Sequence, residues 1–119
     1  MTENKKQYNL EKRTAEFAKN IRIFVRSLSK SISNIEDGKQ VVRSSGSVGA
    51  NYIEANESLS KKDFVMRIKI CRKESKESEY WLNLIDISGN KEIEEQRDIL
   101  AQEAKELMMI FGSIMRKSE

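Results

Sequence analysis

The chain has 119 residues, enough for one domain around a single hydrophobic core and too few for two. It carries 22 Lys or Arg against 19 Asp or Glu, for a formal net charge of +3, and contains neither histidine nor proline. The lack of histidine excludes Ser-His-Asp triads and most zinc sites. The lack of proline and of hairpin turn pairs favours an all-α fold over a sheet.

The first expected helix is marked by apolar residues that alternate in steps of three and four, which is the pattern of one buried helical face. This stripe consists of Leu10, Thr14, Phe17, Ile21, Phe24, Leu28 and Ile32. The segment "IEDG", residues 35–38, is expected to connect it to the second helix. The second stripe consists of Val41, Ser45, Val48, Tyr52, Ala55 and Leu59.

The third expected helix begins after Ser60, an N-cap residue followed three positions later by Asp63, and it is expected to stop at Gly89. Its core line is Phe64, Ile68, Cys71, Ser75, Ser78, Leu82 and Ile85. The fourth helix carries Ile93, Arg97, Leu100, Ala104, Leu107, Phe111 and Ile114. Four helices joined by short turns predict a single domain over residues 1–119, an up-down-up-down antiparallel four-helix bundle.

Small residues gather in the middle of the second helix, in the stretch "RSSGSVGANYIEANES". Gly46 and Gly49 each cost a helix about 1 kcal/mol relative to alanine. Their retention indicates a helix face that another backbone approaches closely. A phosphate-binding loop is a weak alternative, because "GSVGAN" lacks the Gly-Lys-Ser/Thr ending and no strand precedes it.

Catalytic, metal and cofactor sites are not expected. Cys71 lies in the core line and has no histidine to activate it. The carboxylate pairs Glu54 and Glu57, or Glu74 and Glu77, are interpreted as solvated or ion-paired helix faces. The segment "MTENKKQYNLEKR" lacks the apolar core of a signal peptide, and no apolar run approaches the roughly 18 residues of a membrane span. We therefore expect a cytoplasmic protein that is not an enzyme and has no small-molecule substrate.

A second apolar line runs beside the core stripe of the third helix, through Ile70 and Trp81, and the fourth helix repeats it with Ile99 and Ile110. One interpretation is a broad core face. The other is a subunit interface anchored by Trp81, because a monomeric bundle does not need such lines.

Basic residues form outward ridges on the first and third helices, whereas the second and fourth helices are acidic. The ridge of the first helix is Lys5, Lys12, Lys19, Arg26 and Lys30, and that of the third helix is Lys62, Lys69, Lys73 and Lys76. These ridges have the charge and spacing to follow the phosphates of RNA or DNA. The alternative is that they pair with neighbouring acidic helices within or between subunits.

The stretch from Val41 to Ile85, "VVRSSGSVGANYIEANESLSKKDFVMRIKICRKESKESEYWLNLI", closely resembles the core signature of the bacterial 23S rRNA-intervening-sequence proteins. The resemblance implies a four-helix bundle that assembles as a ring-shaped homopentamer and has no known enzymatic activity. Relatives of that family include the accessory proteins of diversity-generating retroelements, which bind nucleic acid and a reverse transcriptase through basic surfaces.

Signature positions carry over to this chain as packing, capping or polar-network residues: Arg43, Ser44, Gly49, Ala50, Asn51, Glu54, Asn56, Asp63, Phe64, Arg72, Glu74, Lys76, Glu77 and Trp81. Arg43 and Arg72 are expected to pair with Glu54 or Glu77 across the second and third helices. Three hypotheses for function follow. The first is a homo-oligomeric bundle that binds RNA or DNA with little sequence preference, and the second is a scaffold for a partner protein. The third, an enzyme with a carboxylate-metal site, is disfavoured because the carboxylate pairs fit solvated or ion-paired helix faces better.

Overall fold

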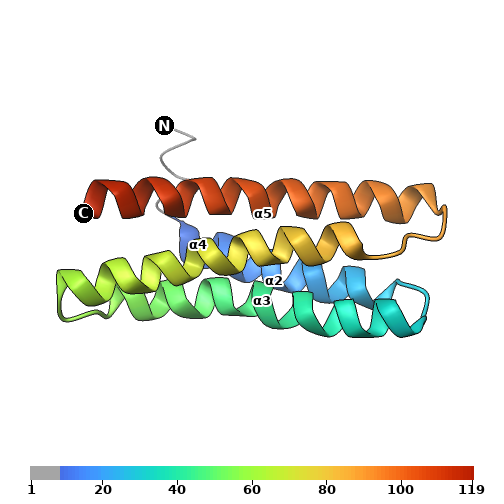
Figure 1. The fold of residues 1–119 in the computed structure, drawn as a ribbon, viewed down its shortest axis with the longest axis horizontal. Helices are drawn as coiled ribbons and strands as arrows, with labels where there is room; N and C mark the ends of the chain where they lie inside the picture. The colour runs from blue at the N-terminus through green and yellow to red at the C-terminus, as the bar shows by residue number, and fades with distance from the viewer. Residues whose placement is uncertain (1–8) are drawn as a thin grey trace.

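The computed structural model describes residues 9–119, which form four α-helices and no strand in that range. The helices are α2 (Leu10–Arg26), α3 (Ile32–Asn56), α4 (Lys61–Leu84) and α5 (Lys91–Ser118). Successive helices run in opposite directions along an elongated body of 46 × 30 × 19 Å (Figure 1). The fold is the all-α, up-down-up-down antiparallel four-helix bundle that the apolar spacing predicts.

The junction between the first two helices lies elsewhere than the sequence predicts. Ser31 is the N-cap of α3, and its hydroxyl accepts a hydrogen bond from the backbone N–H of Asn34 at 3.1 Å. The segment "IEDG" is therefore helical, and Gly38 is buried where an added Cβ would lie 3.0 Å from Val25. Ile32, assigned to the first core stripe, is 85% exposed at the start of α3. The helix boundary is therefore set by the Ser31 cap and not by Gly38.

The start of α4 matches the prediction, but its end does not. The Ser60 hydroxyl accepts a hydrogen bond from the Asp63 N–H at 3.1 Å, which confirms the N-cap. The helix ends at Leu84, before Gly89, which lies in the following turn with a φ of 69°. Leu59, assigned to the second stripe, lies outside α3 and is fully exposed.

The core forms where the predicted stripes of the four helices meet. Phe17, Val48, Ile68 and Leu107 are each no more than 2% exposed, which confirms one face from each helix. Tyr52 and Phe111 meet across the core with ring centroids 5.6 Å apart, an ordinary separation for an aromatic pair. Burial of these side chains, at about 25 cal/mol for each Å² of apolar surface, is the main stabilisation of the bundle.

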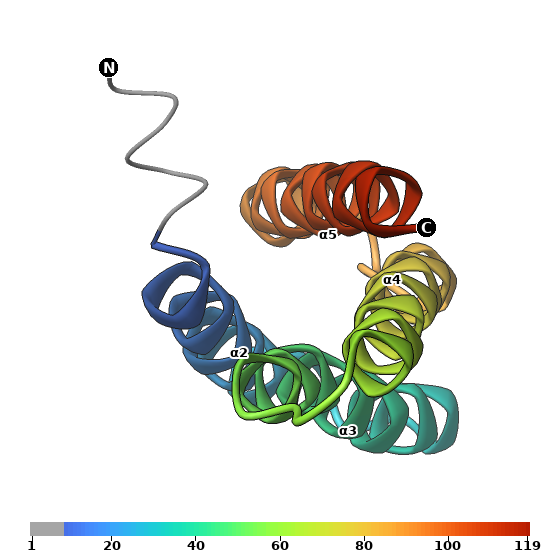
Figure 2. The ribbon, with the colours of Figure 1, turned by 90° about the vertical axis from the view of Figure 1, so that its left-hand side faces the viewer.

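The four helices form an open arc in cross-section, with α2 and α5 at its two ends (Figure 2). α2 and α3 approach closely at Gly49, where an added Cβ would lie 2.9 Å from the Thr14 Oγ1. The close approach expected at the small-residue face is therefore present at Gly49. Between α2 and α5 there is instead a groove of about 870 Å³, lined by residues that include Phe17, Ile99 and Leu100.

Asn34 ties together the two connections at one end of the bundle. Its buried side chain donates to the Ser29 carbonyl at 3.1 Å and to the Asp86 carbonyl at 3.0 Å, and it accepts from the Asp86 N–H at 3.0 Å. Buried amides that satisfy backbone groups in this way hold loops in one conformation. The α2–α3 and α4–α5 connections therefore act as one structural unit.

Candidate nucleic-acid interface

The basic ridge of the first predicted helix is exposed along α2 and the connection that follows it. Lys12, Lys19 and Arg26 project from α2, and Lys30 follows in the connection to α3; all four residues are exposed. Lys5 lies outside the described residues. A lysine or arginine at every seventh position returns to nearly the same side of a helix, so Lys12, Lys19 and Arg26 form one line on α2 opposite the core. The prediction that Lys30 continues this helical line is wrong, because α2 ends at Arg26.

The second ridge follows α4, and Lys62, Lys69, Lys73 and Lys76 are all exposed. The two ridges do not form a single surface on one subunit, because α2 and α4 lie diagonally across the bundle with α3 between them (Figure 2). A nucleic acid that contacts both ridges must therefore pass around the bundle or bridge neighbouring subunits.

The ion pairs in the described part of the chain use cations outside these ridges. Arg13, Lys39, Arg43 and Arg97 form all of the salt bridges among residues 9–119. The described ridge residues have no carboxylate of residues 9–119 within ion-pair distance. Pairing of the ridges with acidic helices of the same subunit, one of the two alternatives from the sequence, is therefore not present in this range.

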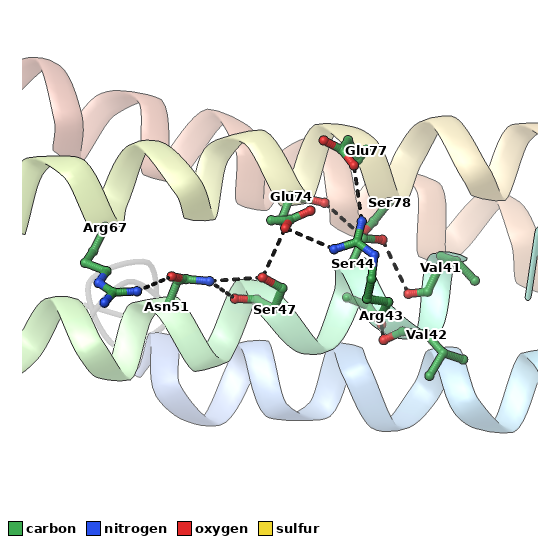
Figure 3. Close-up of polar contacts among 11 residues, drawn as sticks. Val41, Val42, Arg43, Ser44, Ser47, Asn51, Arg67, Glu74, Glu77 and Ser78 are labelled. Atoms are coloured by element: carbon green, nitrogen blue, oxygen red, sulfur yellow. Dashed lines mark hydrogen bonds and ion pairs between the residues drawn. The ribbon is translucent and has the colours of Figure 1, made fainter. Parts of the chain in front are cut away.

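A polar seam joins α3 to α4 on the outer side of the bundle (Figure 3). Arg43 donates from Nη1 to Glu74 and from Nη2 to Glu77, each at 3.3 Å. Ser47 donates to the same Glu74 oxygen at 3.1 Å. The Glu74 side chain is only 9% exposed, so these donors offset the cost of burying its charge.

The seam extends along α3 toward the Lys61 end of α4. Arg67 donates to the Asn51 carbonyl oxygen at 2.9 Å, and the Asn51 amide donates to Ser47 (Figure 3). Deeper in the same seam, Ser44 and Ser78 share a hydrogen bond of 2.8 Å. The signature residues Arg43, Asn51 and Glu77 are thus members of one interhelical hydrogen-bonded network.

The predicted arginine pairs are correct for Arg43 and wrong for Arg72. Arg43 does bind Glu77, but its second partner is Glu74, and Glu54 forms no ion pair within the described chain. Arg72 forms no ion pair there either, and its side chain lies against Gly112 of α5. Arg72 and Glu77 are five residues apart, about 140° around the helix, so they face different neighbours.

Of the residues in the second apolar lines, some pack against the core and one is exposed. Trp81 and Ile110 pack against the core, and Ile70 is half-buried. The Trp81 indole N–H is buried with no acceptor among residues 9–119. Ile99, by contrast, is 70% exposed at the groove between α2 and α5. Of the four candidates, Ile99 has the greatest apolar surface available to a second subunit.

Arg13 bridges the groove between α2 and α5, and the sequence interpretation did not include it. Its guanidinium contacts Glu103 through Nε at 2.7 Å and Nη2 at 2.8 Å, and it reaches Glu106 at 3.0 Å. The pKa of Arg13 is raised, first by the hydrogen bond to Glu103. Little in the sequence indicated this contact, because Arg13 and Glu103 are ninety positions apart. The alternation of basic and acidic helices was the one pattern that pointed to such a pair.

Cys71 is a core residue, as expected. Its side chain is fully buried, and the Sγ donates to the Val48 carbonyl at 3.4 Å. Burial raises the pKa of the Cys71 thiol to about 12. Since the thiolate is the nucleophilic form, burial and the raised pKa both disfavour reaction of this cysteine at neutral pH.

The residues that the structure describes contain no group of three or more His, Cys, Asp or Glu that could hold a metal ion. Their helices also include none that combines the length and apolar character needed to cross a membrane.

The antiparallel helices, the polar seam and the exposed basic ridges define the class: a four-helix-bundle protein with cationic outer faces. The chain belongs to the 23S rRNA-intervening sequence protein family, whose sequence model matches residues 6–112. Among solved structures, it is similar to a protein of unknown function from the S23 ribosomal protein family of Bacteroides thetaiotaomicron VPI-5482. The two are 29% identical with a TM-score of 0.79, over 93% of this chain and 98% of the other. No curated protein matches the chain.

Proposed function

We propose that this protein is a non-enzymatic, cytoplasmic homo-oligomer that binds RNA or DNA through its basic helix faces with little sequence preference. The observation that carries the proposal is that the basic ridges are exposed and unpaired within the described residues. Their described members are all exposed and form no ion pair with residues 9–119. Cations left free in this way release the counterions of a phosphate backbone when they bind it.

Oligomerisation is part of the same proposal. The two ridges lie on diagonal helices, so one subunit offers only short lines of charge to a nucleic acid. A ring of subunits, a homopentamer according to the family resemblance, repeats each line and multiplies weak contacts. The open side between α2 and α5, with Ile99 exposed at its edge, is the surface we assign to the subunit contact.

The test is a titration of the purified full chain into fluorescein-labelled single-stranded RNA and duplex DNA at low and physiological salt. We expect binding that weakens steeply with salt and differs little between sequences. Changing Lys12, Lys19 and Arg26 together to Glu should lower affinity at least about tenfold, since each ridge cation contributes to the salt-dependent electrostatic term. Absence of binding at low salt by the unaltered protein contradicts the proposal.

A matched control distinguishes the effect of lower net charge from the effect of losing cations in the ridge. Lys39, Lys61 and Lys91 are exposed and lie outside both ridges, and their joint change to Glu lowers the formal charge by the same amount. This control should retain most of the affinity. Light scattering should report the same oligomer for both triple variants. Dissociation of the ridge variant alone supports charge pairing between subunits instead.

A second candidate function is a scaffold for a partner protein without direct nucleic-acid contact. The exposed Ile99 and the groove that runs over Phe17 and Leu100 favour it, because apolar grooves with polar rims are common sites of protein contact. Ile99→Lys separates the candidates. It should dissociate the homo-oligomer if the groove holds a second copy, and it should leave the oligomer intact if the groove holds another protein.

A further inference from the structure

Gly112 of α5 is buried even though it has no side chain to pack, and two arginines cover it. A Cβ added to Gly112 would lie 3.2 Å from the Arg116 Nη1, 3.4 Å from the Arg72 Nε and 3.6 Å from the Arg72 Cδ. Arg72 comes from α4 and Arg116 from α5. Arginine side chains from two helices therefore lie beside the same residue of backbone.

The charges of this pair are not neutralised within the described chain. Neither Arg72 nor Arg116 forms an ion pair with a carboxylate of residues 9–119. Lys69 and Lys76, three residues before and four residues after Arg72, lie on the same side of α4 and are exposed. No carboxylate of residues 9–119 lies within ion-pair distance of either guanidinium group at the seam between α4 and α5.

The chemistry of the pair is that of an anion site. Each guanidinium presents N–H donors in a planar fork that matches two oxygens of a phosphate, and an anion between two such forks removes their mutual repulsion. Both side chains remain exposed, so a phosphate can reach them from solvent. α4 and α5 lie side by side along their length (Figures 1 and 2), and Arg116 of α5 shares its position beside Gly112 with Arg72 of α4.

We propose that Arg72 and Arg116 form a clamp for one phosphate group of a nucleic-acid backbone, and that the α4 ridge continues across this clamp onto α5. This inference rests on the proposed function and names the position at which the backbone is held. The basic surface then extends from α4 onto the neighbouring helix α5. Gly112 is then a positioning residue, because it leaves the space in which both guanidinium groups approach the same point.

The first experiment uses Arg72→Gln, Arg116→Gln and the double variant, with fluorescein-labelled single-stranded RNA and duplex DNA in a salt series. Because the two forks bind one group, each single change should lower affinity nearly as much as the double change, by roughly tenfold, and should flatten the salt dependence by about one phosphate contact. Arg72→Lys with Arg116→Lys keeps the charge but loses the forks, so it should restore only part of the affinity.

The matched control is Lys39→Gln with Lys91→Gln, which removes the same charge at exposed positions outside the ridges. It should bind within about threefold of the unaltered protein, the ordinary scatter of context-dependent charge effects. If the clamp variants also bind like the unaltered protein, the clamp is overturned while the proposed function stands. If the unaltered protein binds neither nucleic acid, both fail. If the double glutamine variant loses the oligomer, the pair serves subunit assembly and the clamp is overturned.

A second variant distinguishes the clamp from a structural role. Gly112→Ala places a methyl group nearest to atoms of the flexible Arg72 and Arg116 side chains, while alanine favours a helix by up to about 1 kcal/mol. Its melting temperature should therefore stay level or rise, and its affinity for the labelled RNA and DNA should fall severalfold. Unchanged affinity with unchanged stability contradicts the positioning role.

Discussion

The two sides of the bundle are held together in different ways. Where α3 meets α2 and α4, glycine and serine residues let the backbones approach, as at Gly49 against Thr14 and at the Ser44–Ser78 hydrogen bond of 2.8 Å. Where α2 faces α5, one arginine spans a groove of about 870 Å³. The closed side resembles a protein interior, and the open side is the surface that we propose for contact with a further subunit.

Packing in this bundle follows the order of the helices in the chain. Helices that follow one another are joined by short turns and can use small residues in register with each other. α2 and α5 are joined only through the other two helices, and their contact depends on long side chains that reach across a gap.

The reactivity of Cys71 measures how well the closed side excludes solvent. Burial raises its thiol pKa from 9.0 to about 12. At about pH 8, a colorimetric disulfide reagent should therefore modify Cys71 roughly a thousandfold more slowly in the native protein than in denaturant. Asn20→Cys in a Cys71→Ser background places the thiol in the exposed lining of the open groove and should react rapidly. Fast reaction of native Cys71 contradicts a sealed α3–α4 side.

Gly49→Val tests the close approach of α2 and α3. Its Cβ would lie 2.9 Å from the Thr14 Oγ1 and 3.3 Å from the Thr14 Cβ, so the free energy of unfolding should fall by about 1–3 kcal/mol. Gly46→Ala is the matched control, because its Cβ meets only the end of Arg22 at 3.4 Å and the helix gains propensity. Thermal melting should shift downward for the first variant and level or upward for the second. Equal shifts contradict the role of Gly49.

Arg43→Ala tests the polar seam. It leaves the buried Glu74 carboxylate with Ser47 as its remaining donor, and it should cost about 1–2 kcal/mol, less than for a fully buried pair because Arg43 is 53% exposed. Chemical denaturation measures the change. Lys39→Ala breaks the exposed pair with Glu36 and should cost less than about 0.5 kcal/mol. If Arg43→Ala lowers the free energy of unfolding no more than Lys39→Ala does, the polar seam does not stabilise the bundle.

Arg13→Ala tests the open side. Glu103 and Glu106 remain 26% and 48% exposed, so water can solvate them and the global cost should be about 0.5–1 kcal/mol. The local effect is more informative: amide hydrogen exchange should become faster in α2 and stay unchanged in the α3–α4 pair. Arg22→Ala, on the same helix but away from the groove lining, is the control. Uniform exchange across all helices contradicts a separately held α2.

Much of the fold was predictable because it depends on local pattern. Apolar steps of three and four place Phe17, Val48, Ile68 and Leu107 in the core, and the Ser60 cap marks the start of α4. The errors arose where two local signals compete. Gly38 and Gly89 each suggested a boundary, yet the Ser31 cap lies before the first and α4 ends five residues before the second.

The candidate sites were predictable only in part. The exposure of the basic ridges follows from their position opposite the apolar stripes. The partners of individual arginines do not follow, because they depend on the rotation of each helix about its axis and on which helices are neighbours. Arg72 illustrates this: its residue type suggested a glutamate partner, and its place on the α5 side of α4 gives it Gly112 and Arg116.

The sequence alone determined that this chain forms four amphipathic helices with basic and acidic faces in alternation, because the helical repeat and the serine caps act within a few residues. Tertiary structure alone decided that Asn34 joins two connections, that Arg13 spans the open side, and that two arginines meet over Gly112. These contacts link residues far apart in the chain, and only the packed arrangement of the helices brings them within hydrogen-bonding or van der Waals distance.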